Sequence, residues 1–160
     1  MAATPAITAL ERAGIEYQVH KYRHDARSTD YGAEAVDALG SMLGIVAAQI
    51  FKTLVVDLAG SLAVAIIPVP QQLSLKSAAS ALGSPKAVMA DPKAVTRSTG
   101  YVLGGVSPLG QRTYLPTVID SSAQNWPTVL CSAGRRGLEI ALKPSDLIAV
   151  TGAIVADVAV

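Results

Sequence analysis

The sequence predicts an α+β fold with a mixed, mostly antiparallel sheet, on three observations. Short helix-like and strand-like segments interleave irregularly along the 160 residues, without the regular strand–helix alternation of a doubly wound fold. Two apolar runs, 50–57 and 62–69, flank an Ala-Gly-Ser turn, as in a β-hairpin. Hydrophobic residues make up 51% of the chain and charged residues 16%, so the chain can bury a core and is too apolar to be disordered.

Local signals predict the elements in order. A helix is expected over 4–14, because Thr4 can cap it and a proline and a glycine mark its two ends. Polar and apolar residues alternate over 15–22, which predicts a half-buried strand. A helix over 30–40 should follow, whereas 41–49 fits either a longer helix or a loop. After the hairpin, the expected elements are a helix at 73–82, a strand at 87–89, a helix at 91–97, strands at 117–120, 128–131 and 138–142, a helix at 143–150 and a strand at 154–158.

One domain covering 1–160 is expected, because no low-complexity tract, linker or repeat divides the chain. The longest apolar stretches, 62–69 and 148–160, are too short and interrupted to span a membrane. The first residues lack the basic and apolar segments of a secretory signal, and one cysteine cannot form an internal disulfide. A cytoplasmic location is therefore expected.

The charge balance limits the kinds of partner. Lys and Arg number 13 and Asp and Glu 12, giving a formal net charge of +1. A DNA-binding protein that neutralises many phosphates is not expected from this balance. Any nucleic-acid contact should be small and local, or assisted by another protein.

The most unusual segment is the glycine loop, residues 100–110, which holds four of the thirteen glycines. It contains neither a dinucleotide GxGxxG pattern nor a P-loop, and Ser107 does not lie in a GxSxG elbow. Glycines let a backbone approach a ligand closely, and the N–H groups of Gly104 and Gly105 could stabilise an oxyanion. The alternative is a turn-rich connection that needs positive φ angles.

Lys52 is the one charged residue within the apolar run 50–56. Either it faces solvent from a half-exposed strand, or it points a compact cation into a pocket, toward a carbonyl or phosphate group.

Three further features have a structural and a chemical interpretation. His20 and His24 lack a third matching ligand, so no metal site is expected. Cys131 lies in an apolar strand and should be a core residue rather than a reactive thiol. Arg135 and Arg136 should form a basic turn, either solvated or in contact with phosphate.

Several segments together resemble the YbaK/EbsC family of aminoacyl-tRNA deacylases, especially its Cys-tRNA(Pro) branch. They cover nearly the whole chain in order: TPA at 4–6, HKYRHD at 20–25, FKTL at 51–54, MADP at 89–92, RSTGYVLGGVSPLGQ at 97–111 and SAGRRGLE at 132–139. The resemblance implies a sheet curled toward a barrel with surrounding helices, in a domain that also occurs inserted in some prolyl-tRNA synthetases.

The resemblance also implies the site residues. The family's essential lysine falls on Lys52, and its GxxxP motif runs from Gly104 through Gly105 to Pro108. The substrate-binding positions that it implies are Tyr22, Tyr31, Thr53, Ser107, Ser132 and Glu139, with Arg135 and Arg136 expected to contact tRNA. The sequence departs from the family at Tyr31, often Phe, at Ala133, which replaces a glycine, and at a longer 44–49 segment.

The implied function is removal of a mischarged amino acid, above all cysteine from tRNA(Pro). The substrate's own thiol would attack its carbonyl, so no cofactor and no protein nucleophile are expected. The acceptor end of tRNA and prolyl-tRNA synthetase are the implied partners. Two alternatives remain: a deacylase for alanyl- or seryl-tRNA, and a non-catalytic module that binds a synthetase or a nucleotide.

Overall fold

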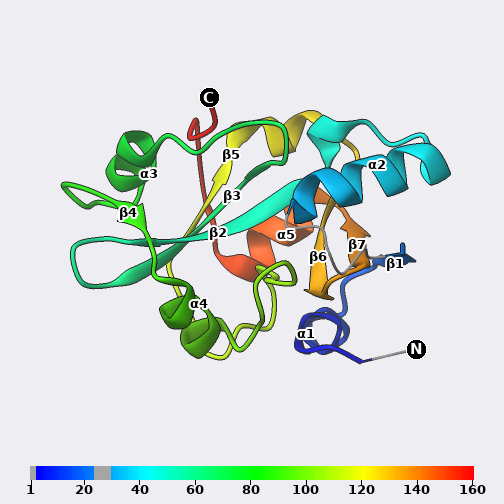
Figure 1. Ribbon diagram of the computed structural model, residues 1–160, viewed down its shortest axis with the longest axis horizontal. Coiled ribbons are helices and arrows are strands. Elements are labelled where there is room, and N and C mark those ends of the chain that lie inside the picture. The colour runs from blue at the N-terminus through cyan, green and yellow to red at the C-terminus, as the bar shows by residue number, and fades with distance from the viewer. Residues whose placement is uncertain (1–2, 24–29) are drawn as a thin grey trace.

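Two β-sheets form the centre of the computed structural model, which describes residues 3–23 and 30–160 (Figure 1). The first is antiparallel, with the order β1 (Gln18–Lys21), β7 (Leu138–Leu142) and β6 (Val129–Arg135). The second has the order β4 (Val88–Met89), β2 (Phe51–Asp57), β3 (Leu62–Pro68), β5 (Thr117–Asp120) and β8 (Ile154–Ala156). Only β3–β5 and β5–β8 are parallel among the paired strands described, so the predicted mixed, mostly antiparallel α+β fold is confirmed.

The two sheets meet where β2 begins. A parallel bridge joins Ile50 to Leu130, although the described strands do not close into one barrel. The predicted hairpin is confirmed, with β2 and β3 in register from Phe51–Pro68 to Asp57–Leu62. Strand β4 pairs with β2 only at Val56 and Asp57. The edge of β2 near Phe51, at the other end of the strand, is therefore not paired with β4. The candidate site lies at that end.

Helices cover both sheets: α1 (Pro5–Ala13), α2 (Tyr31–Leu43), α3 (Leu75–Ala81), α4 (Pro92–Thr99) and α5 (Pro144–Thr151), with 3₁₀ turns at Ala47–Gln49 and Ser121–Asn125. The first begins as predicted, because the Thr4 hydroxyl accepts the Ile7 N–H at 3.2 Å. The second passes its expected end near Gly40, so of the two alternatives for 41–49 the longer helix holds as far as Leu43. That helix continues to Leu43, because Gly44, with φ 67°, takes the left-handed conformation that ends it.

Two predicted strands have different lengths in the structure. The strand expected over 15–22 is shorter, Gln18–Lys21, and the one expected over 128–131 continues to Arg135. That extension contains an irregularity between Ser132 and Arg135, where the register with β7 shifts. A local bulge turns the strand near the site.

The main core lies between the hairpin and the antiparallel sheet, with α1 and α5 packed against it. Its fully buried side chains include Leu10, Ile66, Ile140 and Leu147. Cys131 is also fully buried there, and burial raises the pKa of its thiol, which confirms a core role. No described helix combines the length and apolarity needed to cross a bilayer.

Candidate active site

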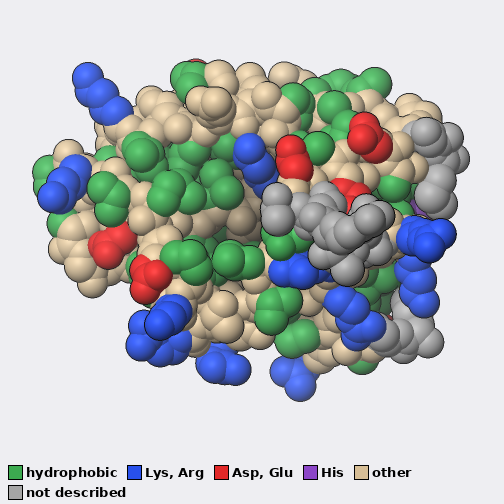
Figure 2. All heavy atoms as spheres, in the orientation of Figure 1, with side chains coloured by type: hydrophobic (Ala, Val, Ile, Leu, Met, Phe, Trp, Pro, Cys, Tyr) green, Lys and Arg blue, Asp and Glu red, His purple; other side chains and the backbone are tan. Residues whose placement is uncertain are grey.

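A pocket of about 300 Å³ lies between β2, the antiparallel sheet, the start of α2 and the glycine loop. Figure 2 shows this side of the molecule, where green side chains gather around a central hollow. The polar residues that line the pocket are Tyr22, Tyr31, Lys52, Thr53, Ser132 and Glu139. The other lining residues are Gly32, Ala35, Phe51, Leu54, Val69, Leu103, Gly104 and Val106.

Strand β2 brings Lys52 and Thr53 to the pocket. Lys52 is half-buried, and no acidic group in the described ranges forms an ion pair with its ammonium. The Thr53 hydroxyl is buried without a hydrogen-bond partner among the described residues. A buried hydroxyl without a partner costs free energy, so these two groups can both gain contacts from an anionic or carbonyl-bearing ligand.

Strand β7 brings Glu139 to the pocket lining. Its side chain is only 6% exposed, and burial raises its pKa to about 8. Within the described chain it makes no hydrogen bond. The nearby Tyr22 has its pKa raised to about 12, by burial and by the charge of Glu139. Glu139 is therefore protonated at neutral pH and can ionise when a cationic group enters the pocket.

Replacement of Glu139 by glutamine should change how stability depends on pH. The folded-state pKa of Glu139 is raised above its unfolded value. Its contribution to folding stability is therefore fully present at low pH and is lost as pH rises from about 4.5 to about 8. Glutamine cannot ionise, so the difference in Tm between Glu139→Gln and the unsubstituted protein should move in favour of the variant from pH 5 to pH 8. A constant difference would place the carboxyl in a solvated environment.

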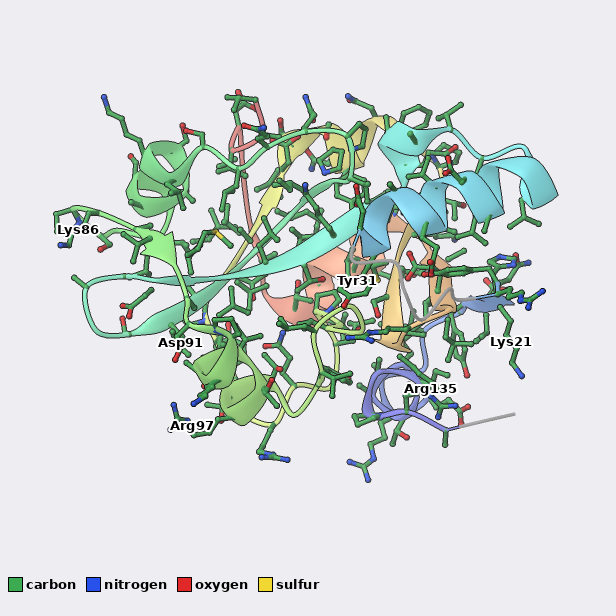
Figure 3. The ribbon with its side chains drawn as sticks, in the orientation of Figure 1. Lys21, Tyr31, Lys86, Asp91, Arg97 and Arg135 are labelled. Carbon is green, nitrogen blue, oxygen red and sulfur yellow. The ribbon has the colours of Figure 1, made fainter. Side chains whose placement is uncertain are left out.

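Contacts among Arg136, Tyr31 and Gly104 hold the glycine loop against α2. The Arg136 Nε donates to the Leu103 carbonyl at 2.9 Å, and its guanidinium lies 4.5 Å from the centre of the Tyr31 ring. Gly104, with φ 87°, fits beneath them: a Cβ there would lie 2.7 Å from Arg136 Nε and 2.8 Å from the Tyr31 ring. Figure 3 shows Tyr31 in the middle of this arrangement, beside the loop.

The two loop N–H groups expected to stabilise an oxyanion differ in the structure. The Gly105 N–H donates to the Val102 carbonyl at 3.0 Å, so it is occupied within the loop. The Gly104 N–H makes no hydrogen bond with a described residue, and Gly104 lines the pocket. Of the pair, Gly104 is therefore the available donor.

Five expected site residues lie outside the pocket lining: Gly105, described above, and four more. Ser107 is fully buried, and its hydroxyl accepts the Leu109 N–H at 3.2 Å, which stabilises the loop. Pro108 is buried beside it. Arg135 is exposed, on the side of α1 in Figure 3, and Arg136 is occupied by the loop contacts described above.

Of the departures from the family pattern, Tyr31 lines the pocket, whereas Ala133 does not. Ala133 is buried and its carbonyl accepts the Thr4 hydroxyl, so it contacts α1 and does not line the pocket. His20 is half-buried on β1, and His24 lies outside the described residues. Across ranges 3–23 and 30–160, no three His, Cys, Asp or Glu residues are grouped so that they could hold a metal ion.

The apolar lining was not predicted from the sequence. Leu54, Val69 and Val106 have the composition of ordinary core residues, so no pattern marks them. Gly32 did carry a signal. A glycine in the first turn lowers the stability of a helix, so its presence there indicates that packing requires it. The reason is close approach: a Cβ at Gly32 would lie 2.8 Å from Val69 Cγ1.

Residues 31–150 match the family model of the aminoacyl-tRNA editing domain. The chain belongs to this family. Membership confirms the class of activity that the resemblance implied: the protein is an aminoacyl-tRNA deacylase, and its substrate is an aminoacyl-tRNA.

Relatives of this editing domain agree over the whole chain. The sequence is 34% identical over 156 residues to EbsC of Enterococcus faecalis, assigned as a Cys-tRNA(Pro)/Cys-tRNA(Cys) deacylase, and the match covers 97% of this chain and 92% of EbsC. A solved structure described as a trans-editing enzyme for prolyl-tRNA synthetase is 28% identical, with a TM-score of 0.85 over 100% of this chain and 99% of that one. The hypothetical protein APE2540 is also 28% identical, with a TM-score of 0.83 over 98% of this chain and 100% of its own.

Proposed function

We propose that this editing domain, acting as one unit over 1–160, removes cysteine from mischarged tRNA(Pro). The observation that carries the proposal is a small pocket lined both by a half-buried lysine, without an ion-pair partner in the described chain, and by a buried glutamate whose pKa is raised by burial. A lysine can hold the phosphate or ester of the terminal nucleotide, and the glutamate can accept the substrate's α-ammonium. The assignment of EbsC to Cys-tRNA(Pro) and Cys-tRNA(Cys) supports cysteine as the amino acid.

The roles of the other residues follow from where they lie. The Gly104 N–H, which makes no hydrogen bond with a described residue, would polarise the scissile carbonyl. Tyr22, Tyr31, Thr53 and Ser132 form the polar walls around the amino acid. Gly105, Ser107, Pro108 and Arg136 act indirectly, because they shape and hold the loop rather than line the pocket. Arg135 remains available for a tRNA phosphate.

The substrate supplies its own nucleophile in this mechanism. The cysteinyl sulfur bonds to the carbonyl carbon, the ester bond to the ribose breaks, and the thiol proton ends on the ribose oxygen. The product is a cyclic thiolactone, which water then opens to cysteine. Correct positioning of an intramolecular attack can lower the barrier by roughly 7–11 kcal/mol.

The pocket supports this mechanism by what lines it. The described lining residues include no cysteine and no histidine, so no Cys–His or Ser–His pair forms among them. The Ser132 hydroxyl accepts the Gly134 N–H at 3.1 Å and lacks a basic partner among the described residues. The chain's single cysteine, Cys131, is fully buried.

Replacement of Cys131 by alanine should therefore leave turnover of Cys-tRNA(Pro) nearly unchanged. The variant should lose some stability, because a buried side chain is shortened, so the assay is run well below its Tm. Mass spectrometry of quenched reactions should detect the thiolactone with both proteins. A cysteinyl–enzyme adduct in the unsubstituted protein, together with a folded but inactive Cys131→Ala, would contradict the mechanism.

Cooperation with prolyl-tRNA synthetase is part of the proposal. A net charge of +1 provides little general affinity for tRNA, so a partner that binds tRNA(Pro) would supply the specificity. The solved relative described as a trans-editing enzyme for that synthetase supports this partner.

A further inference from the structure

A second groove, of about 410 Å³, lies between α4 and the tip of the glycine loop. Its lining residues are Pro92, Lys93, Thr96, Arg97 and Leu103. Leu103 also lines the candidate active-site pocket, so the groove and the site adjoin at this side chain. A ligand that fills the pocket and extends past Leu103 therefore enters this groove.

The groove is positively charged. Lys93 and Arg97 are four residues apart on α4, so they share one face of the helix, and both are exposed. Neither forms an ion pair with any residue of the described ranges. Exposed Arg112 lies against Gly100, where α4 ends, with its guanidinium 3.5 Å from the position of a Cβ there.

One carboxylate, that of Asp91, lies at the start of the same helix. Figure 3 shows Arg97 on the outer side of α4, and Figure 2 shows Lys and Arg side chains gathered over this helix. Three cations and one carboxylate give this small region a local excess of positive charge, on a chain whose formal net charge is only +1. Such a concentration of charge beside the site fits a polyanion better than a neutral ligand.

We propose that the α4 groove binds the phosphates of the 3′ strand of tRNA that leads to the aminoacylated nucleotide. The proposal rests on the proposed function, because it assumes that this nucleotide occupies the pocket. Lys93 and Arg97 contact successive phosphates of the strand, while exposed Leu103 supports the chain where it leaves the pocket. Arg136 was expected to contact a tRNA phosphate, but its guanidinium contacts Tyr31 and the Leu103 carbonyl. We therefore assign the phosphate contact to this groove instead.

The test measures binding of an uncharged RNA hairpin that ends in single-stranded CCA, over a range of salt concentrations. The Lys93→Ala/Arg97→Ala protein is compared with Lys76→Ala/Lys86→Ala, which removes the same charge from positions outside the groove. The first pair should weaken binding and reduce the slope of log affinity against log salt by about 0.7 for each phosphate of the single strand that the variant no longer neutralises. The control pair should change both quantities much less.

Two results would overturn the proposal. Equal weakening of RNA binding by both pairs would show that net charge alone governs binding. Unchanged RNA affinity of Lys93→Ala/Arg97→Ala would show that the groove does not bind RNA, and would favour an acidic protein surface as its ligand. A hairpin that lacks the CCA end should not distinguish the two pairs, and it would contradict the assignment to the 3′ strand if it did. Failure of the proposed function would appear separately, as no hydrolysis of Cys-tRNA(Pro) by the unsubstituted protein.

Discussion

Replacement of Lys52 by alanine is expected to abolish deacylation while leaving the fold intact. The lysine lines the pocket and forms no ion pair with the described chain, so its removal disrupts no salt bridge there. It does remove the cation that, among the described residues, lines the pocket. Loss of one such electrostatic group typically lowers kcat by about 10²–10³-fold. The measurement is kcat/KM on Cys-tRNA(Pro), with Tm as the check on folding.

Two companion variants sharpen this result. Lys52→Arg should also fail, because a planar, longer guanidinium does not replace a compact ammonium in a pocket of about 300 Å³. Lys21→Ala, at an exposed position on β1, removes the same charge outside the pocket lining and should keep full activity. Near-normal turnover by Lys52→Ala would make the residue a half-exposed strand lysine without a role in the reaction.

Replacement of Gly104 by alanine is the second change with a large expected effect. The new Cβ would lie 2.7 Å from Arg136 Nε and 2.8 Å from the Tyr31 ring, and we expect the loop to move away from α2 because both side chains would otherwise have to shift. That movement displaces the N–H that, of the Gly104–Gly105 pair, is free to polarise the carbonyl. A displacement of about 1 Å at a reacting centre can cost about 100-fold in rate, and we expect a loss of at least this size in kcat.

A matched control separates the collision from backbone strain. Gly83 has a similar positive φ, 74°, but a Cβ there meets nothing within 4 Å. Gly83→Ala and Gly104→Ala should each lose about 1–2 kcal/mol of stability from the left-handed conformation. Only Gly104→Ala should lose activity. If the two variants kept equal activity, the position of the Gly104 backbone would not matter to the reaction.

Local patterns were sufficient to predict most of the elements. The hairpin was predicted because two β-rich runs flank a short turn, and α1 because a capping threonine and a closing glycine mark its ends. The end of α2 was left open between Gly40 and a longer helix, because Gly40 and Gly44 carry the same local signal and only the structure shows that Gly44 is left-handed. The parallel pairing of β3, β5 and β8 joins distant segments, and no local pattern specifies it.

The candidate site was only partly accessible to residue patterns. Lys52 was conspicuous because a charge interrupts an apolar strand, whereas Tyr22 and Glu139 entered through the family resemblance alone. No pattern could show that Glu139 is protonated, because its raised pKa comes from burial by segments far apart in the chain. For the same reason, the different contacts of Arg135 and Arg136 became visible only in the structure.

The most direct test of the account compares hydrolysis of Cys-tRNA(Pro), Ser-tRNA(Pro) and Ala-tRNA(Pro) by the purified protein. Seryl and cysteinyl groups differ by one atom, and binding alone separates near-isosteric substrates by only about 10–200-fold. If the substrate's thiol is the nucleophile, Cys-tRNA(Pro) should be cleaved more than about 200-fold faster than either of the others, beyond the reach of binding. Comparable rates for seryl- or alanyl-tRNA(Pro) would contradict the account.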